Sequence, residues 1–274
     1  MDRVPICFIE EVVLQLEKTP YSKDRKYPSI WGEVANKKLT RERAYLHLYL
    51  KSKEQAYFCV YDGNNEQLEL DRIGQFVFVD IKVTDDLDED WNTGELPKYH
   101  PLTKKNFQLL QNVILKPFPC SLELYLHTNP THPLVQRLFL AIPRVAEVRL
   151  KSQVPLSMDT VTQSIERGTL KYFSCYYIDI YLTHEMLSVF LRFVASEQMN
   201  QFEITLSDDS PVSYEALLNG VIDAVLRRKR GCRIGVDKRY GHLCARLEEE
   251  TARVKVLYDP DDNCLYVKRD RDMQ

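Results

Sequence analysis

The feature that most constrains the fold of this chain is an alternation of short strand-like runs and helical runs between residues 121 and 254. Three apolar triplets with the same internal spacing locate the strand-like runs: Val145, Val148 and Leu150; Leu170, Phe173 and Cys175; and Met199, Phe202 and Ile204. Each triplet leads into a polar turn and then a run with apolar residues at helical spacing. This alternation predicts an α/β fold.

The strand–helix units have similar lengths. Successive units begin 24, 25, 29 and 32 residues apart when their first residues are taken as Ser121, Val145, Leu170, Met199 and Gly231. Pro133 suits a first helical turn, and Thr183 and Ser213 suit N-caps. Five such units favour a degenerate leucine-rich-repeat-like strand–helix solenoid, although Asn129 is the only corner residue of the regular type. An open sheet built from strand–helix–strand crossovers is the alternative.

Three segments are predicted along the chain. Residues 1–40 form a helical segment, with Ile9, Val12, Val13 and Leu16 on one face of the first helix. Residues 43–118 are β-rich, with two or three antiparallel strands expected in a meander, an acidic loop at 85–90 and a helix at 103–115. Residues 119–274 carry the repeats, including a weaker fifth helix after residue 240, and end in a hairpin that would cap the sheet.

Composition excludes several classes of protein. The net charge of −3 over 274 residues gives no general attraction to nucleic acid or anionic membranes. No apolar run approaches the roughly 18–20 residues that span a bilayer. The seven cysteines are scattered without a C-x-x-C pair, which favours reduced thiols in an intracellular protein of the cytoplasm or nucleus.

The N-terminus resembles a degenerate F-box. The stretch MDRVPICFIEEVVLQL has a Leu-Pro-like start at Val4-Pro5 and an amphipathic helix, and Trp31 stands where that motif has a late Trp. The whole chain resembles a large nematode family of F-box-related proteins with a β-rich segment and loose leucine-rich-like repeats. Residues 165–202, with GTLKYFSC and FLRFVASEQMNQF, carry this resemblance best.

The resemblance implies a substrate-recognition subunit of a cullin ubiquitin ligase. In such proteins the N-terminal helices dock on a Skp-type adaptor, which makes Val4, Pro5 and Ile9 the expected adaptor contacts. The repeats would then hold the substrate. Only about forty residues precede the β-rich segment, and residues 18–29 are polar where an F-box packs further helices.

The expected partner surface is the sheet face opposite the helices. Each triplet spans six residues, of which the fourth and sixth point to the helices, so the third and fifth point to the open face. These outward residues are Glu123, Tyr125, Glu147, Arg149, Tyr172, Ser174, Gln201, Glu203, Arg233 and Gly235. Tyrosine and arginine are enriched at interfaces, which makes Tyr125, Arg149, Tyr172, Glu203 and Arg233 the predicted contacts. A simply solvated sheet face is the alternative.

No catalytic or cofactor motif stands out, so the chain is expected to be no enzyme and to hold no cofactor or metal. One alternative is a small thiol or acid–base enzyme that uses Cys120, His127 and His132. Another is nucleic-acid binding through the basic run from Arg227 to Arg239. The basic run also has an ordinary structural explanation. Cations stabilise the C-terminus of a helix, and Gly231 is placed to end such a helix here.

Overall fold

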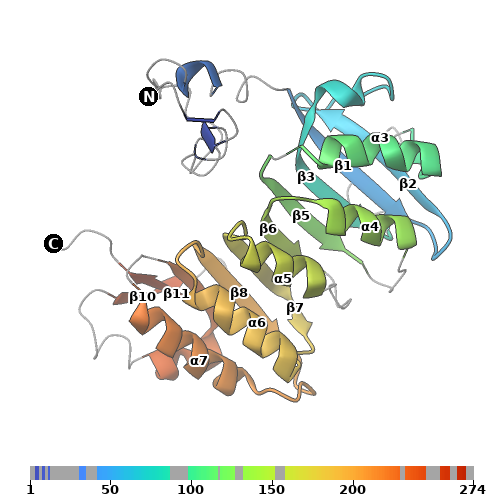
Figure 1. The fold of residues 1–274 in the computed structure, drawn as a ribbon. Coiled ribbons are helices and arrows are strands. Elements are labelled where there is room, and N and C mark those ends of the chain that lie inside the picture. Colours follow the sequence, from blue (N-terminus) through green and yellow to red (C-terminus); the bar gives the residue numbers. More distant parts are fainter. Residues whose placement is uncertain are drawn as a thin grey trace.

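The structure is a computed structural model, and it describes residues 4–5, 8–9, 12, 31–34, 42–86, 98–116, 118–126, 132–151, 158–228, 232–244, 254–259 and 264–269. Its centre is an open, mixed sheet of eleven strands in the order β10-β11-β9-β8-β7-β6-β5-β3-β1-β2-β4. The helices α3 to α7 lie in a row over one face of this sheet (Figure 1). The predicted α/β class is confirmed.

Seven strands run parallel and lie side by side in chain order: β1 (Arg43–Leu50), β3 (Val77–Thr84), β5 (Cys120–Tyr125), β6 (Val145–Leu150), β7 (Tyr172–Ile180), β8 (Gln201–Leu206) and β9 (Arg233–Asp237). Antiparallel strands close both edges. The strands β2 (Ala56–Asp62) and β4 (His100–Pro101) lie beyond β1, and β11 (Cys264–Arg269) and β10 (Val254–Asp259) lie beyond β9. The predicted C-terminal hairpin therefore forms and extends the sheet.

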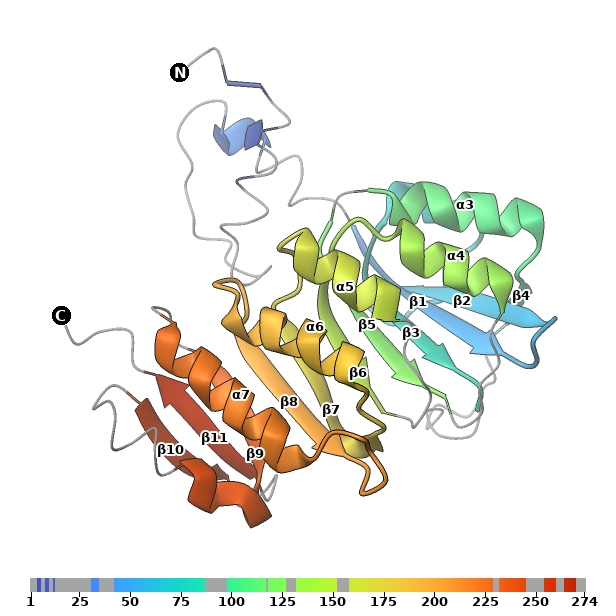
Figure 2. The ribbon, with the colours of Figure 1, turned by 60° about the horizontal axis from the view of Figure 1, so that its bottom comes forward.

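The helices that connect the parallel strands are α3 (Lys104–Ile114), α4 (Pro133–Ala141), α5 (Met158–Glu166), α6 (His184–Ala195) and α7 (Tyr214–Arg227). Figure 2 shows all five on the same side of the sheet. The predicted helix starts are confirmed: Thr183 and Ser213 accept hydrogen bonds from the backbone N–H groups of Met186 and Ala216, and Pro133 occupies the first turn of α4.

One continuous hydrophobic core lies between the sheet and the helices, and its buried residues run from Ala44 to Val236. In β1 every second side chain is buried on this side, as a sheet with one covered face requires. Phe173, Phe190 and Phe202 meet between α6 and the sheet, with ring centroids 4.8 to 5.9 Å apart. Fully burying each ring contributes about 1.5–3 kcal/mol. The segments expected as 43–118 and 119–274 thus share one sheet and one core.

Neighbouring helices are also joined by a recurrent polar contact at their C-terminal ends. Arg167, which follows α5, donates to the carbonyl of Ile142 at the end of α4 at 3.2 Å. Gln198, which follows α6, donates to Ile165 in the last turn of α5 at 3.3 Å. These side chains satisfy carbonyls that a helix end leaves without an intrahelical partner.

Arg228 repeats this contact after α7, and it is almost fully buried. Its guanidinium donates to the carbonyls of Val194 at 2.8 Å and Met199 at 2.7 Å, and also to Ser196. All three carbonyls lie at or just after the C-terminal end of α6, where positive charge is favoured. Arg167, Gln198 and Arg228 therefore each link the end of one helix to the end of the preceding helix by hydrogen bonds.

The antiparallel meander expected over residues 43–118 is only partly correct. The β1–β2 pair is antiparallel as expected, but β3 pairs with the other edge of β1 and runs parallel to it. Residues 67–70 form no strand and contribute a single bridge between Gln67 and Tyr61. The β1–β2 hairpin returns the chain to the end where β1 began, so a strand that starts there must run parallel to β1.

The expected fifth helix falls largely on residues 245–253, which lie outside the described residues. The described part of the connection after β9 is a 3-10 helix, η2 (Lys238–Cys244). Of the predicted acidic loop, only Asp85 and Asp86 are described. At the N-terminus residues 8–9, 12 and 31–34 are helical, which agrees with a helical segment over residues 1–40 at the positions that the structure describes.

Candidate interaction surface

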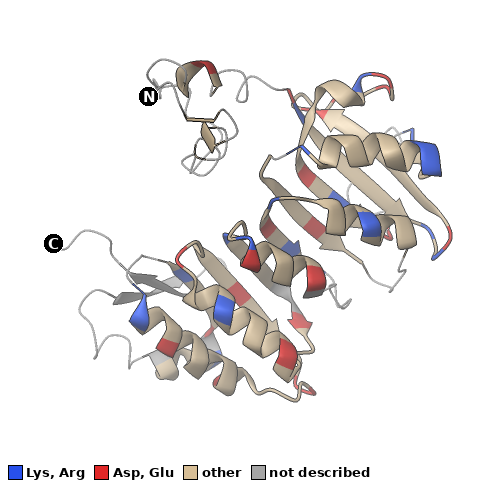
Figure 3. Cartoon of the chain, in the orientation of Figure 1, with Lys and Arg blue, Asp and Glu red and all other residues tan. Residues whose placement is uncertain are grey.

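The sheet face opposite the helices carries polar and aromatic side chains in regular rows. The burial pattern of β5 alternates, so Leu122 and Leu124 enter the core while Glu123 and Tyr125 face away from it. The register then places the outward residues of neighbouring strands next to one another. Figure 3 shows acidic and basic positions distributed along these strands. On β6 the burial pattern agrees with the predicted inward and outward positions, whereas on β8 the predicted outward residue Glu203 is itself buried.

An ion-pair network lies at the centre of this face. Arg149 donates through Nε to Glu147 at 2.6 Å and through a terminal nitrogen to Glu123 on the neighbouring strand. Although partial burial opposes it, these two carboxylates raise the pKa of Arg149 above its usual value. Arg149 is therefore held in place between β5 and β6 rather than extended into solvent.

Asp80 on β3 adds a third carboxylate to the network. Burial first, and then the negative charge of Glu123, raise the pKa of Asp80 to about 7, against the opposing influence of Arg149. Its register neighbours are Tyr45 on β1 and Ser121 on β5. An aspartate at this position is therefore poorly solvated and has two carboxylates nearby.

A cluster of aromatic and basic side chains lies beside the network. Lys82 and Lys151 hold their ammonium groups 4.3 and 4.4 Å from the centre of the Tyr125 ring, and Lys151 also donates to its hydroxyl. On β1, His47 lies against Tyr61 with ring centroids 5.1 Å apart. Burial first, and then the charge of Lys82, lower the pKa of His47 to about 4, so this imidazole is neutral at physiological pH.

The part of this face formed by β1 and β3 was missed in the sequence analysis, which placed the surface on the repeats alone. Tyr45, His47, Asp80 and Lys82 belong to the same rows as the predicted residues. Strict alternation in residues 43–50 was the available signal. It did not reveal that β1 adjoins the repeats.

The predicted contacts differ in accessibility. Tyr172 is half-buried, and its hydroxyl accepts a hydrogen bond from Asn200 at 3.2 Å, while Arg233 is exposed. Glu203 faces the same side but is only 6% exposed. It accepts a hydrogen bond from Ser174 at 3.0 Å and lies across Gly235, which has no side chain to displace it. Glu203 is therefore the least accessible of the predicted contacts.

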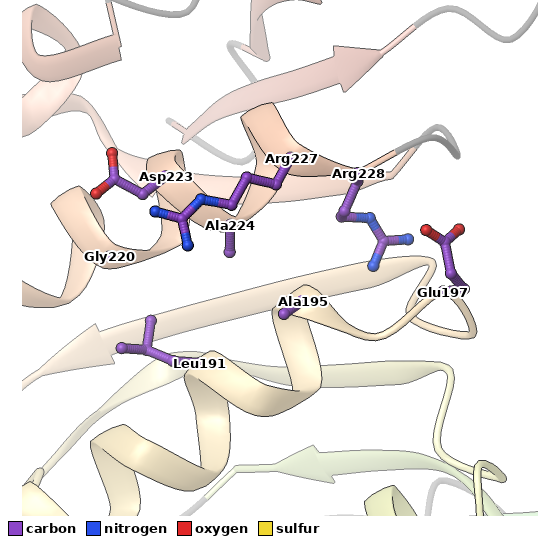
Figure 4. Close-up of a pocket in the computed structure, with 8 residues that line it drawn as sticks. All are labelled: Leu191, Ala195, Glu197, Gly220, Asp223, Ala224, Arg227 and Arg228. Atoms are coloured by element: carbon purple, nitrogen blue, oxygen red, sulfur yellow. The ribbon is translucent and has the colours of Figure 1, made fainter.

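The basic run that ends α7 is divided between two environments. Figure 4 shows Arg227 and Arg228 at a groove of about 330 Å³ between α6 and α7, which Asp223 and Glu197 also line. Arg227 is exposed, but Arg228 is buried against the end of α6. Lys229 and Arg230 lie outside the described residues. The predicted explanation is only partly correct: Arg228 does stabilise a helix C-terminus, but it is that of the preceding helix α6, and α7 already ends at Arg227 rather than at Gly231. Arg228 is buried and so takes no part in a nucleic-acid surface.

No known family model, curated protein or solved structure matches the chain. The likeness to F-box-related proteins thus rests on the sequence motifs quoted above.

The thiol proposed for an enzyme site is buried. Cys120 is 4% exposed, and its Sγ donates to the carbonyl of Arg144 at 3.6 Å. Burial, and then the charge of Asp80, raise the pKa of this thiol to about 12, which disfavours the nucleophilic thiolate. His132 is buried at the N-terminus of α4, and His127 lies outside the described residues.

The three N-terminal residues expected to contact an adaptor differ in exposure. Val4 is half-buried, Pro5 is exposed, and Ile9 is fully buried outside the core of the sheet. The carbonyl of Pro5 accepts hydrogen bonds from the N–H groups of Phe8 and Ile9, so a helical turn begins here. Phe8 is 54% exposed, which adds an apolar side chain to this surface.

Two further properties concern only the part of the chain that the structure describes. None of its helices is long and apolar enough to cross a membrane. Within the same residues, histidine, cysteine and acidic side chains do not gather in groups of three or more that would hold a metal ion.

Proposed function

We propose that this chain is a non-enzymatic protein-interaction module that binds a protein partner on the open face of its sheet. The single observation that supports this best is the one-sided placement of the helices, which leaves a face of seven parallel strands for contact (Figure 2). Strands that follow chain order with helices on one side are typical of leucine-rich-repeat-like solenoids, whose extended faces bind proteins. We assign the chain to that architecture as part of the proposal.

The chemistry of the face supports binding over simple solvation. Lys82 and Lys151 lie against the ring of Tyr125, and Arg149 is bonded to two glutamates, so these side chains are held in fixed positions by their neighbours. Ordered side chains lose less conformational entropy when a partner binds. Tyr172, with its hydroxyl bonded to Asn200, and Arg233, exposed at the neighbouring end of β9, are the best contacts for a partner.

We further propose that the N-terminal segment docks on a Skp-type adaptor, so that the bound partner becomes a substrate of a cullin ubiquitin ligase. The support is the F-box-like start at Val4-Pro5, the helical turn that follows it and the exposed side chain of Phe8. The adaptor part and the partner part of the proposal are independent and have separate tests.

Native affinity purification of the full chain tests the partner part. The test variant carries Tyr172→Ala and Arg233→Ala on the open face. The matched control carries Leu140→Ala and Arg192→Ala, because these side chains are 42% and 56% exposed on the helices α4 and α6, which cover the other face of the sheet. Mass spectrometry should find specific partners with the control and not with the test variant. Equal recovery with both variants would contradict binding on this face.

Mixing the purified chain with a purified Skp-type adaptor tests the adaptor part. A complex should elute together in size-exclusion chromatography, and Phe8→Asp should abolish it because a charge replaces an exposed apolar contact. A folded chain that never forms this complex would remove the ligase assignment. It would leave the partner-binding assignment to its own experiment.

A further inference from the structure

We propose that two copies of this chain associate edge to edge, with β10 of one copy pairing antiparallel with β10 of the other. The strand β10 reads VKVLYD, with a lysine near one end, an aspartate at the other and apolar residues between them. This self-association is independent of the proposed function, because it uses an edge of the sheet rather than its open face.

The two edges of the sheet differ in what covers them. At one edge, β4 pairs with the start of β2, and the segment that follows β2 folds back along its end. In that segment Leu68 donates its N–H to the carbonyl of Val60 at 2.8 Å, and Gln67 forms a bridge with Tyr61. At the other edge β10 is the outermost strand, and within the described residues its backbone pairs with β11 alone (Figure 2). Such an edge presents N–H and C=O groups with which a further strand can pair.

The register assigns each residue of β10 to one face of the sheet. Through their pairing partners on β11, Lys255 lies in one row with Arg233 of β9, and Asp259 lies in one row with Asp237. Arg233 and Asp237 are the two ends of β9 that are not buried, and they belong to the open-face rows. Because faces alternate along a strand, the open-face positions of β10 are Lys255, Leu257 and Asp259, and the helix-side positions are Val254, Val256 and Tyr258.

The symmetry of a dimer limits the possible registers. Two copies of one edge strand pair antiparallel about a two-fold axis perpendicular to the sheet, so that both open faces lie on the same side. Paired residues must then hold positions on the same face, which requires one residue of β10 to lie on the axis opposite its own copy. With Leu257 on the axis, Lys255 of each copy lies opposite Asp259 of the other, and Val256 lies opposite Tyr258.

The charges select this register over its neighbours. Opposite charges, and aromatic residues opposite β-branched ones, are the cross-strand pairs that stabilise antiparallel strands. The register with Leu257 on the axis forms each of these pairs twice. With Val256 on the axis, Lys255 would lie opposite Leu257, and with Tyr258 on the axis Asp259 would do so. Neither charge would then meet its opposite within β10.

The neighbouring strands favour an acidic residue opposite Lys255. Lys255 pairs with Lys268 on β11, and Lys268 pairs with Arg233 on β9, so three cations follow one another across the sheet. Like charges directly opposite each other on adjacent strands are destabilising. Asp259 of the second copy would be the next residue in this row and would offset that repulsion. Asp237, in the row of Asp259, is already bonded to Arg239.

Sedimentation equilibrium of the full chain at several concentrations tests the proposal, and the original chain should form a reversible dimer. Lys255→Glu and Asp259→Lys each place like charges at both ion-pair positions, so each variant should dimerise at least about tenfold more weakly. Mixing the two variants pairs opposite charges again and should give a heterodimer of about the original affinity. A single chain with both substitutions should recover the homodimer for the same reason.

Lys53→Glu and Asp71→Lys are the matched controls, because both residues are exposed in the segments that follow β1 and β2, far from β10. They should dimerise as the original chain does, and circular dichroism checks that every variant is folded. Three results would overturn the proposal. They are a chain that stays monomeric at every concentration, single β10 variants that dimerise like the original, and a mixture and double variant that both remain weak.

Discussion

The side chain of Glu203 occupies the space above Gly235: a Cβ built on that glycine would lie 2.2 Å from Cγ of Glu203. Carbon atoms do not approach so closely, so Gly235→Ala must displace the glutamate from its position against Ser174. We expect this substitution to lower the free energy of unfolding by about 1–3 kcal/mol in urea denaturation.

Gly74→Ala is the control for that prediction, because nothing lies within 4 Å of a Cβ at that position. It should change stability by less than about 0.5 kcal/mol. Adding Glu203→Ala to Gly235→Ala should recover part of the loss, since the two side chains compete for one space. Additive effects of the two substitutions would show that they do not interact.

Arg228→Met should destabilise the chain by about 2–4 kcal/mol, because it leaves buried carbonyls at the end of α6 without their donor. Arg227→Met, one residue earlier on the exposed side, removes the same charge and should cost less than about 0.5 kcal/mol. Urea unfolding of both variants gives the comparison. A smaller effect at Arg228 than at Arg227 would rule out the capping role.

The pH dependence of stability should show two opposed contributions on the open face. His47 has an ordinary pKa of 6.5 and a folded pKa of about 4, so the unfolded chain binds a proton first and stability falls as pH drops from 6.5 to 4. Asp80 has an ordinary pKa of 3.8 and a folded pKa of about 7, so the folded chain binds the proton first. Its contribution to stability therefore grows as pH drops from 7 to 4.

Replacing either residue should leave the contribution of the other to the pH dependence of stability unopposed. We expect Asp80→Asn to lose stability more steeply than the original chain between pH 6.5 and 4.5, and His47→Asn to lose it less steeply. The change in slope should be on the order of 1 kcal/mol per pH unit. Urea unfolding at several pH values measures these slopes. Slopes that stay parallel to that of the original chain would exclude the opposed titrations.

Cys120 should resist alkylation by iodoacetamide at pH 7.5 in the folded chain and react readily in urea. Its thiol is 4% exposed, and its pKa is raised to about 12, so little thiolate is present or accessible. Peptide mapping by mass spectrometry gives the labelled fraction at this position. Rapid labelling in the folded chain would instead support a thiol enzyme.

Local sequence patterns predicted much of this fold because they depend on neighbouring residues. The N-caps Thr183 and Ser213 act within one helical turn, and the triplets show which strand residues enter the core. The direction of β3 was not predictable in this way, because apolar spacing is the same in parallel and antiparallel strands with one buried face.

The candidate site was predicted less completely, because its details depend on residues far apart in the chain. The burial of Glu203 is coupled to the missing side chain of Gly235, on the next strand. Arg228 reads as a surface cation in sequence, and only the packing of α7 beside α6 brings it to buried carbonyls. The place of Asp80 on this surface depends on the pairing of β3 with β5, which local sequence patterns do not show.

The contacts of Arg167, Gln198 and Arg228 each reach back by one helix, and the hairpins at both edges of the sheet do not take part in them. A duplicated strand–helix unit in the middle of the chain would meet the same neighbours as the original unit. It would widen the open face by one strand, about 4.8 Å, and leave both edges unchanged. Gain or loss of whole units would therefore change the width of this face without altering either edge of the sheet.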